Sequence, residues 1–333
     1  MQRRVFPERF LPDMLIFDRQ AVADALPYAR LVDALADAFA GATVTPPRTL
    51  HTLPVPGASD ATLLLMPAWQ QGAMLGIKIA TVFPDNVQRG LASVQASYLL
   101  LDATSGTPLA ILDGAELTLR RTAAASALAS RYLSREDAAI LLIVGTGKLA
   151  PHMIAAHAAV RPITQVLIWG RRPSQAQQLA ATLASRDLEV QAASSLAEAV
   201  AAADIICCAT LSSEPLIRGS WLQPGQHVDL VGAFTPAMCE ADAAALTRSR
   251  VFVDTYEGAL SEAGEIVQAM RAGLIVREDL LADLASLARA GHAGRDSASD
   301  ITLFKSVGTA IEDLAAASCV MQSQAPGSRD ESR

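Results

Sequence analysis

The second half of the chain alternates short apolar runs with segments of helical character. From residue 138 onward the apolar runs AAILLIVG, QVLIWG, DIICCAT, QHVDLVGA and RVFVDT are separated by segments such as LAPHMIAAHAAV and SQAQQLAATLAS. Apolar runs of four to eight residues between helical patterns are typical of strands buried on both faces of a parallel sheet. The pattern therefore predicts an α/β fold with a doubly wound parallel sheet.

The first 115 residues follow another pattern, in which short apolar runs are joined by turn residues. A helical pattern near residues 20–40 comes first, and runs such as TLLLMPAW and GAMLGIKIATVF follow it. The segment ASYLLLDATSGTPLAILDG predicts a hairpin, because two apolar runs flank the turn sequence ATSGTP. This part of the chain is predicted to be mainly antiparallel strand.

An Ala-rich helix at residues 116–134 is predicted to bridge the two patterns. Near the end, REDLLADLASLARAGHAG reads as helical, and DSASDITLFKSVG as a loop entering a final helix. We predict two domains and a disordered polar tail. The strand-rich domain takes residues 1–118 and is completed by a helix at 300–322, the parallel-sheet domain takes 119–299, and the tail takes 323–333.

Composition and charge exclude several classes of protein. The formal net charge is −7 and the basic residues form no runs, so the sequence lacks the basic patches of a nucleic-acid-binding protein. No stretch of about 18 apolar residues predicts a membrane span, and the N-terminal sequence MQRRVFPERFLPDMLIF lacks the apolar core of a signal peptide. We expect a cytoplasmic protein with a small-molecule partner and no membrane partner.

The four cysteines are Cys207, Cys208, Cys239 and Cys319, and they form no C-x-x-C pair. We expect reduced thiols and no metal site. Cys207 and Cys208 lie in the run ADIICCAT and are interpreted as inert residues of a buried strand.

A glycine motif follows the first strand of the predicted parallel sheet. Gly145, Gly147 and Ala150 match G-x-G-x-x-A directly after a strand and directly before a helix. The first glycine allows a tight turn, the second lets a pyrophosphate approach the backbone, and the alanine lets helix and strand pack closely. In this context the motif predicts a Rossmann dinucleotide site, with the phosphates at the helix N-terminus.

The end of the next strand indicates which nucleotide binds. NAD sites usually carry an acidic residue there, whereas this chain continues from Gly170 into Arg171 and Arg172. Guanidinium groups suit a 2′-phosphate, so NADPH is favoured and NADH stays possible. The alternative is that both arginines are ordinary solvated surface residues.

Several further motifs, taken together, carry a resemblance to a known family. They are PPRT at Pro46, GIKIATVFPDN at Gly76, LTLRRTAAASALAS at Leu117, DLVGAFTPAMCEAD at Asp229, VDTYEGALSEAGEI at Val253 and SDITLFKSVGTAIEDL at Ser299. In this order, and with the glycine motif, the chain resembles the ornithine cyclodeaminase and mu-crystallin family over residues 40 to 315. The resemblance implies a Rossmann domain and a strand-rich domain through which two copies form a homodimer.

Family members act on amino or imino acids with a dinucleotide, and the resemblance places three cations at the substrate carboxylate. These are Arg48, Lys78 and Arg121. The roles are chemically reasonable, because an arginine binds a carboxylate with two parallel hydrogen bonds and a lysine adds a point charge. Each residue also has an alternative interpretation. Arg48 could be an exposed surface residue, Arg121 could pair with an acidic residue on the helix surface, and Lys78 could have a structural role in its apolar strand.

The resemblance extends to other site residues. Thr146, Thr210, Gly232, Lys305 and Ser306 are expected to join the glycine motif in binding the nucleotide. Asp300 is a candidate for substrate binding, with a helix N-cap as the alternative. His51 is a weaker candidate near Arg48, and His152 and His157 are expected to take no part in the chemistry.

One loop favours a particular activity within the family. Ornithine cyclodeaminases carry an aspartate in the loop that here reads Gly232-Ala233-Phe234-Thr235-Pro236, and this chain has no carboxylate there. Members with a similar loop resemble reductases of cyclic imino acids, which convert Δ1-pyrroline-2-carboxylate to L-proline and Δ1-piperideine-2-carboxylate to L-pipecolate. The alternatives are ornithine cyclodeamination, alanine dehydrogenation, dehydration of cis-3-hydroxyproline, and a mu-crystallin-like protein that binds NADPH without catalysis.

Overall fold

The computed structural model describes residues 14–186 and 188–323 of the chain, and most of the predicted tail at 323–333 lies outside these residues. Contacts between Cα atoms divide the chain into two compact units. Unit 1 comprises residues 1–27, 42–118 and 310–333, and unit 2 comprises residues 28–41 and 119–309. Residues 28–41 and 300–309 thus group with the parallel-sheet unit, whereas the sequence assigned them to the strand-rich domain.

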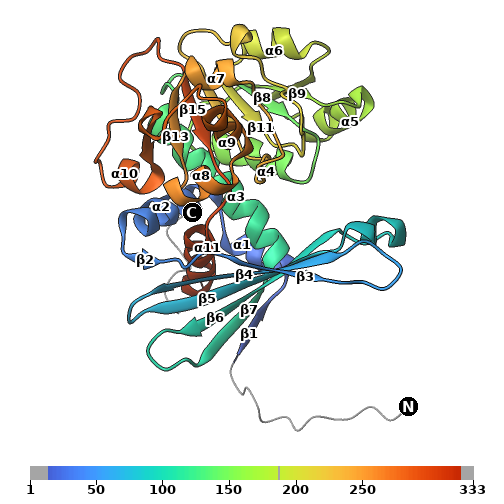
Figure 1. The fold of residues 1–333 in the computed structure, drawn as a ribbon, viewed down its shortest axis with the longest axis vertical. Helices are drawn as coiled ribbons and strands as arrows, with labels where there is room; N and C mark the ends of the chain where they lie inside the picture. The colour runs from blue at the N-terminus through green and yellow to red at the C-terminus, as the bar shows by residue number, and fades with distance from the viewer. Residues whose placement is uncertain (1–13, 187, 324–333) are drawn as a thin grey trace. The chain divides into compact units, whose positions relative to one another are not determined.

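Unit 1 is built on a sheet that has seven strands within the described residues (Figure 1). The strands are β1 (Leu15–Phe17), β2 (Thr43–Val44), β3 (Thr49–Leu53), β4 (Ala61–Gln70), β5 (Met74–Val82), β6 (Val94–Asp102) and β7 (Pro108–Asp113). Their order is β1-β7-β6-β5-β4-β2, and β3 also pairs with β4. All pairs are antiparallel except β1 with β7, so the predicted strand-rich region and the hairpin between β6 and β7 are confirmed.

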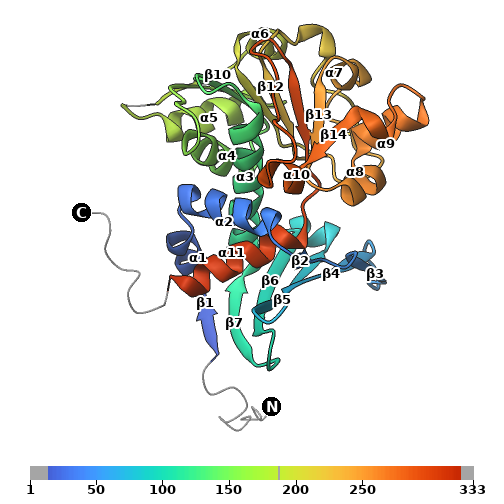
Figure 2. The same cartoon turned by 90° about the vertical axis from the view of Figure 1, so that its left-hand side faces the viewer.

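The two faces of this sheet differ in burial. Helix α11 (Ala310–Gln322) packs on β4, β5 and β6, and α1 (Arg19–Ala25) packs on β7 (Figure 2). Residues pointing to the helices, such as Met66, Tyr98 and Leu112, are buried. On the other face, the strand register aligns one apolar row across five strands, formed by Pro67, Ile77, Leu99, Ile111 and Ile16.

Unit 2 contains a sheet of eight strands among the described residues, and every neighbouring pair is parallel. The strands are β8 (Ile140–Val144), β9 (Gln165–Trp169), β10 (Glu189–Ala192), β11 (Ile205–Cys208), β12 (His227–Leu230), β13 (Arg250–Val253), β14 (Leu280–Asp283) and β15 (Thr302–Lys305). The order β10-β9-β8-β11-β12-β15-β13-β14 changes direction at β8. This confirms the predicted doubly wound sheet and puts its switch point next to the glycine motif.

Helices cover the sheet, and all of them except α2 lie between its strands along the chain. They are α2 (Tyr28–Ala40), α4 (Leu149–Ala158), α5 (Pro173–Leu183), α6 (Leu196–Ala202), α7 (Ala243–Thr247), α8 (Tyr256–Glu262), α9 (Gly264–Arg271) and α10 (Leu284–Ala288). The predicted bridging helix is α3 (Gly114–Leu133), whose first residues belong to unit 1 and whose remainder belongs to unit 2. Short 3₁₀ turns lie at η1 (Pro84–Arg89), η2 (Gly219–Trp221) and η3 (Arg277–Asp279).

Three predictions of secondary structure were wrong. The helix expected at 20–40 is two helices, α1 and α2, because Pro27 interrupts the pattern and cannot continue a helix. The segment expected to be helical from residue 277 contains the strand β14 before α10 begins. The segment ITLFK, expected as a loop, forms the buried strand β15 between β12 and β13.

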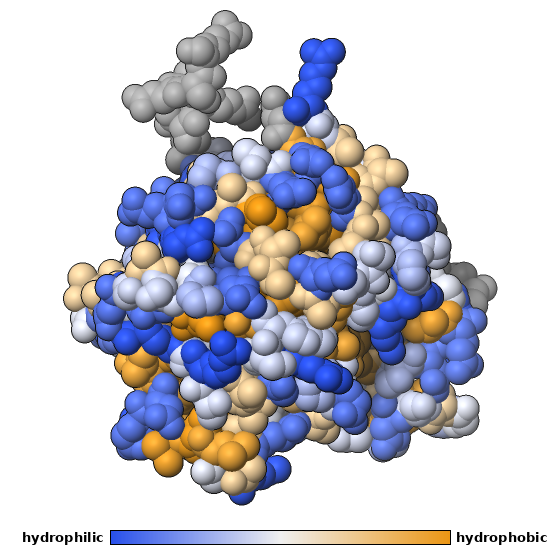
Figure 3. Space-filling view, turned by 90° about the horizontal axis from the view of Figure 1, so that it is seen from above, coloured by the Kyte–Doolittle hydropathy of each residue, from blue (hydrophilic) through white to orange (hydrophobic). Residues whose placement is uncertain are grey.

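Among the described residues, no helix is both long and apolar enough to span a membrane. The face of the molecule shown in Figure 3 carries hydrophilic and hydrophobic residues interspersed. Large apolar residues exposed in unit 2, such as Leu211 and Leu274, are far apart in the sequence and lie in different loops. The apolar row on the unit 1 sheet differs from them, because its residues are aligned on neighbouring strands.

Candidate functional site

The glycine motif forms the turn between β8 and α4. Gly145 has φ +125°, a backbone conformation that favours glycine, and a Cβ there would lie 2.7 Å from the Ala209 carbonyl oxygen. A Cβ at Gly147 would meet nothing within 4 Å, so the space above this residue is open. No side chain caps the first turn of α4, which begins after Lys148. A helix N-terminus without a side-chain cap, beside open space, fits the phosphates of a dinucleotide.

The loops after β11 and β12 are joined by one buried side chain, Glu240, which the sequence analysis missed. Glu240 Oε1 accepts hydrogen bonds from the backbone N–H (2.6 Å) and hydroxyl (2.9 Å) of Thr210. Glu240 Oε2 accepts from the backbone N–H of Gly232 (2.6 Å). A Cβ at Gly232 would collide with the Thr210 carbonyl oxygen. Two predicted nucleotide-binding residues are therefore held together at the carboxyl ends of neighbouring strands, where doubly wound sheets bind ligands.

A second acidic residue and Lys305 continue this network inside unit 2. Glu265 Oε1 accepts a hydrogen bond from the Glu240 backbone N–H (2.7 Å), and Glu265 Oε2 lies 3.2 Å from Lys305 Nζ. The Lys305 side chain is 0% exposed. Burial raises the pKa of the Glu240 carboxyl, and the Lys305 ammonium opposes that rise. Lys305 thus contributes charge to the network that holds the loops, and its ammonium is not exposed for direct contact with a nucleotide.

The two arginines expected at the ribose lie just after β9. Arg171 and Arg172 are both exposed, and Arg172 precedes the first residue of α5, where Pro173 opens the helix. A Cβ at Gly170 would lie 2.8 Å from Thr146 Cγ2, so the end of β9 packs closely on the glycine loop. The structure therefore brings Thr146 and the start of the two-arginine segment together within unit 2.

In unit 1, the predicted cation Lys78 is buried in the middle of β5. Its side chain is 5% exposed, and its Nζ lies 2.7 Å from Asp313 Oδ2 on α11. Asp313 is itself 0% exposed and lies in the first turn of α11, and it was not predicted as a site residue. The costly unpaired ammonium considered from the sequence is avoided by this ion pair.

In unit 2, Arg121 is buried on α3, with only 6% of the residue exposed. It packs against the segment after β15, because a Cβ at Gly308 would lie 2.6 Å from Arg121 Nη1. That segment is fixed by Asp254 Oδ2, which accepts hydrogen bonds from the backbone N–H groups of Val307 (2.8 Å) and Gly308 (2.7 Å). Asp254, another residue missed from the sequence, therefore shapes the backbone beside Arg121.

The remaining candidates differ in burial and in their hydrogen-bond partners. Arg48 is half-buried and His51 is exposed on β3. Asp300 does not cap a helix, which corrects that alternative. Its Oδ2 accepts hydrogen bonds from the backbone N–H groups of Asp296 (3.0 Å) and Ser297 (3.0 Å). Ser306 is buried directly after β15 and donates its backbone N–H to the Leu230 carbonyl (3.1 Å).

A polar cluster lies in the core of unit 2, where the sequence predicted inert packing. Cys207 Sγ–H donates to Asp229 Oδ2 (3.1 Å), and Cys207 Sγ lies 3.5 Å from His157 Nε2. Ser126 Oγ donates to Asp229 Oδ1 (3.2 Å). His157, Cys207 and Asp229 are close enough to bind one metal ion, but the hydrogen bonds among them and to Ser126 already account for their polar atoms. Burial raises the pKa of Asp229 to about 7 and lowers the pKa of His157 to about 4.

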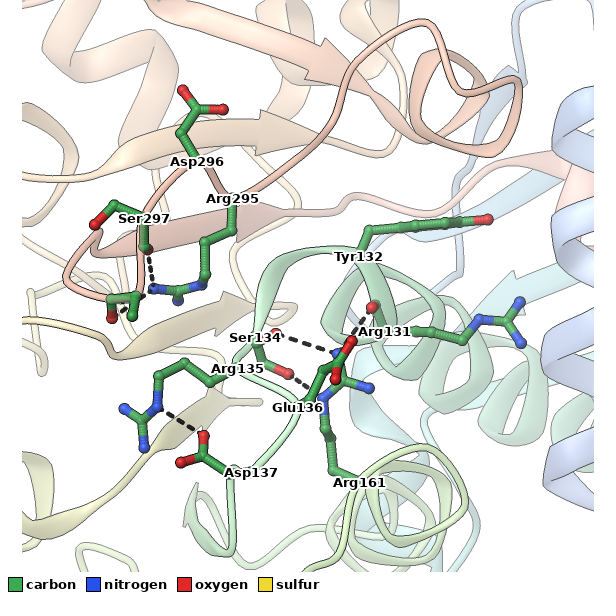
Figure 4. A pocket seen from close by; sticks show the side chains of 11 residues that line it. Arg131, Tyr132, Ser134, Arg135, Glu136, Asp137, Arg161, Arg295, Asp296 and Ser297 are labelled. Atoms are coloured by element: carbon green, nitrogen blue, oxygen red, sulfur yellow. Dashed lines mark hydrogen bonds and ion pairs between the residues drawn. The ribbon is translucent and has the colours of Figure 1, made fainter.

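A hollow at the opposite edge of the same sheet is lined by arginines (Figure 4). The main lining residues are Arg131, Arg135, Arg161, Arg295, Glu136 and Asp137. Arg161 Nη2 donates to the carbonyls of Ser130 (3.0 Å) and Arg131 (2.8 Å), and Arg295 Nε donates to that of Leu133 (2.8 Å). These guanidinium groups donate hydrogen bonds to the last carbonyls of α3. Their positive charges also interact favourably with the negative end of the helix dipole. The hollow is therefore explained by helix capping.

Comparison with known proteins gives consistent results over nearly the whole chain. The model of the ornithine cyclodeaminase/mu-crystallin family matches residues 15–327. A Δ1-pyrroline-2-carboxylate reductase of Paracoccus denitrificans is 41% identical over 81% of this chain and 88% of that protein. The solved structure of Thermococcus litoralis Δ1-pyrroline-2-carboxylate reductase with NADH and L-proline has a TM-score of 0.86 and 33% identity, covering 93% of this chain and 97% of that one. An archaeal alanine dehydrogenase dimer with bound NAD has a TM-score of 0.85 and 28% identity, covering 93% and 95%.

The buried cluster predicts an unusual dependence of stability on pH. The folded-state pKa of Asp229 is about 7 and its ordinary value is 3.8, so between pH 4 and 7 Asp229 ionises in the unfolded chain but stays protonated in the folded protein. The folded state therefore loses stability as the pH rises through this range. Asp229→Asn cannot ionise, so its stability relative to the wild type should rise over that range, by up to the order of 4 kcal/mol. Chemical denaturation at pH 4 to 8 measures the difference in the free energy of unfolding between the variant and the wild type. His157 has an opposite dependence on pH, but it is present in both proteins, so its contribution largely cancels.

The matched control is Asp102→Asn in the β6–β7 turn. Hydrogen bonds from the Thr104 hydroxyl and from Ser105 lower the pKa of Asp102 to about 2, so this carboxyl is ionised throughout the same range. Its stability difference from the wild type should stay constant between pH 4 and 8. A constant difference for Asp229→Asn as well would mean that Asp229 titrates normally, against our expectation.

Proposed function

The chain belongs to the ornithine cyclodeaminase/mu-crystallin family, and from this we propose that it is a nicotinamide-dependent reductase of cyclic imino acids. The proposed substrates are Δ1-pyrroline-2-carboxylate and Δ1-piperideine-2-carboxylate, which would yield L-proline and L-pipecolate. The observation that carries the proposal is the similarity, over 93% of the chain, to a reductase solved with NADH and L-proline. The curated reductase that is 41% identical supports the same substrate class.

We infer that the nucleotide binds at the carboxyl edge of the unit 2 sheet. Gly145, Thr146 and Gly147 would contact the pyrophosphate together with the first N–H groups of α4. Ala150 is 1% exposed and lets that helix pack on the sheet. Thr210 and Gly232 would shape the loops beside the nicotinamide, held by Glu240. A bound nicotinamide nucleotide supplies the hydride that reduces the carbon of the C=N bond.

The substrate carboxylate requires fixed positive charge. We propose that Lys78, Arg48 and Arg121 provide it, and that these contacts orient the imine carbon for hydride transfer. The imine would react in the form that is protonated on the ring nitrogen. Addition of hydride to the adjacent carbon then gives the neutral secondary amine. Asp300 takes no part in this scheme, because its carboxylate is occupied by its own turn.

The loop after β12 favours reduction over ring closure of ornithine. Phe234 is 43% exposed and Thr235 is half-buried, and neither supplies a carboxylate for the side-chain amine of ornithine. The retained cations argue against a carrier without catalysis. Reduction consumes the nucleotide stoichiometrically, whereas cyclodeamination regenerates it and releases ammonia, so the two reactions are easily separated.

We further propose that the protein forms a homodimer through the open face of the unit 1 sheet. The apolar row from Pro67 to Ile16 crosses five strands, and Ile79 and Ile111 on this face are 40% and 36% exposed. A continuous apolar face of this kind marks an interaction surface in a folded protein. The archaeal alanine dehydrogenase, which has a similar fold, is a dimer.

The proposed activity is tested by mixing the purified protein with each cyclic imine, pyruvate plus ammonia or cis-3-hydroxyproline and either NADPH or NADH. Ornithine is tested separately with NAD+, because its cyclodeamination begins with hydride transfer to the oxidised nucleotide. We expect loss of absorbance at 340 nm with the cyclic imines, with one nucleotide oxidised per imine reduced. Release of ammonia from ornithine without net nucleotide oxidation would contradict the proposal. Tight nucleotide binding without any turnover would indicate the non-catalytic alternative.

The exposed arginine pair predicts a preference for NADPH. Arg171→Asp replaces a guanidinium with a carboxylate that repels a 2′-phosphate, so the KM for NADPH should rise about tenfold or more while that for NADH changes little or falls. Steady-state kinetics with both nucleotides measure the ratio. Arg186→Asp, at an exposed site after α5, is the matched control and should leave both values unchanged. Equal effects on the two nucleotides, or none, would remove Arg171 from the 2′-phosphate site.

The dimer is tested by placing a charge on the open sheet face. Ile79→Lys should shift the protein from dimer to monomer in sedimentation velocity, because an apolar interface does not accommodate an unpaired ammonium. Leu211→Lys is the control, since Leu211 is 73% exposed on unit 2. A dimer that survives Ile79→Lys unchanged would place the interface elsewhere.

A further inference from the structure

We propose that Asp313 is the positioning residue for Lys78: it keeps the ammonium charged and oriented toward the substrate carboxylate. This inference rests on the proposed function and deepens it. Asp313 would act through Lys78 and would not contact the substrate itself. Asp313 lies in the motif that begins at Ser299, but it is not among the site residues predicted from the sequence.

The strand register explains why these groups meet. Lys78 on β5 lies opposite Met66 on β4 and opposite Tyr98 on β6, and all three side chains point to the face that α11 covers. Gly76 is the next residue on that face of β5, and a Cβ there would collide with the Tyr98 hydroxyl. The Tyr98 side chain therefore occupies the space above Gly76, which leaves Lys78 enclosed between neighbouring strands and the helix.

The position of Asp313 suits a buried negative charge. It lies in the first turns of α11, where backbone N–H groups and the helix dipole favour a carboxylate. Its Oδ2 is 2.7 Å from Lys78 Nζ, which makes a close ion pair between two buried side chains. A carboxylate this close favours the charged form of the ammonium.

Of the three elements packed against β5, two carry titratable groups. β4 contributes none, β6 contributes Tyr98 and, at its far end, Asp102, and α11 contributes Glu312, Asp313 and Cys319. Burial, and secondarily the charge of Asp313, raise the pKa of Tyr98 well above its ordinary value, so this phenol stays neutral. Asp313 forms an ion pair with Lys78, with Oδ2 and Nζ 2.7 Å apart.

The arrangement resolves a conflict between binding and burial. A lysine in an apolar strand tends to lose its proton, whereas carboxylate binding requires the charged form. Arg48 and Arg121 do not face this conflict, because guanidinium groups stay protonated in proteins. Removal of the Asp313 charge should therefore affect the substrate side of the reaction and its alkaline limit, and should leave nucleotide binding intact.

The test compares wild-type protein with Asp313→Asn. The imine reduction rate is measured from pH 6 to 10, and binding of pyrrole-2-carboxylate, an aromatic carboxylate that is not reduced, is measured by calorimetry over the same range. For Asp313→Asn we expect the KM for the imine and the Kd for pyrrole-2-carboxylate to rise about 10- to 100-fold. The alkaline limb of the pyrrole-2-carboxylate binding profile, to which deprotonation of the imine does not contribute, should move down by about one pH unit or more. The KM for the nucleotide should stay within about twofold, which also shows that the variant is folded.

Three further variants separate positioning from mere structural support. Asp313→Glu should restore the alkaline limb at least partly, because it restores the charge. Lys78→Arg should abolish the limb, because the guanidinium does not titrate in this range, and it provides the test if Asp313→Asn does not fold. Glu116→Gln removes another buried carboxylate of unit 1, paired with Arg19 at 3.1 Å, and should lower stability without moving the KM for the imine or the limb.

The outcomes are distinguishable from failure of the proposed function. If Asp313→Asn keeps the wild-type KM and alkaline limb, or if Lys78→Arg retains that limb, Asp313 has no positioning role. If the wild type reduces no imine but binds pyrrole-2-carboxylate in the predicted Asp313-dependent way, the proposed reaction is wrong and the positioning role stands. If the wild type binds neither compound, both inferences are overturned.

Discussion

The cost of burying a charge is the constraint on which this structure depends. An ionised side chain transferred from water to an apolar interior is strongly destabilising unless a partner of opposite charge or several hydrogen bonds replace its hydration. Both units bury charges at the places where function is expected. Lys78 is paired with Asp313 in unit 1, and Lys305 is paired with Glu265 in unit 2. Each pair is held by elements that are distant in the sequence, so it can form only when its unit has folded.

The two pairs have different consequences. The pair in unit 2 extends to Glu240, whose carboxylate accepts backbone N–H groups from the loops after β11 and β12. There the buried charge fixes backbone, and the loops that it fixes lie at the edge where a doubly wound sheet binds its ligand. In unit 1 the charge is on a side chain that we propose to contact the substrate. One network therefore shapes a surface, whereas the other sets the protonation of a single group.

The local sequence predicted what local patterns determine. The alternation of strands and helices, the β6–β7 hairpin and the glycine turn all follow from neighbouring residues, and the structure contains them. Pro27 was visible but was not used to divide the helix at 20–40. Glu240, Asp254 and Asp313 could not be found in this way, because their partners Thr210, Gly308 and Lys78 are remote in the chain. The strand β15 was missed because four residues are too few to show a period.

A site that binds a small carboxylate needs cations that are charged but not fully satisfied. Guanidinium groups meet the first condition unaided, because they stay protonated in proteins. An ammonium in an apolar interior meets it only if an acidic partner is present. This difference explains why the structure encloses an aspartate beside Lys78. It also implies that the alkaline limit of carboxylate binding is determined in unit 1, by one ion pair.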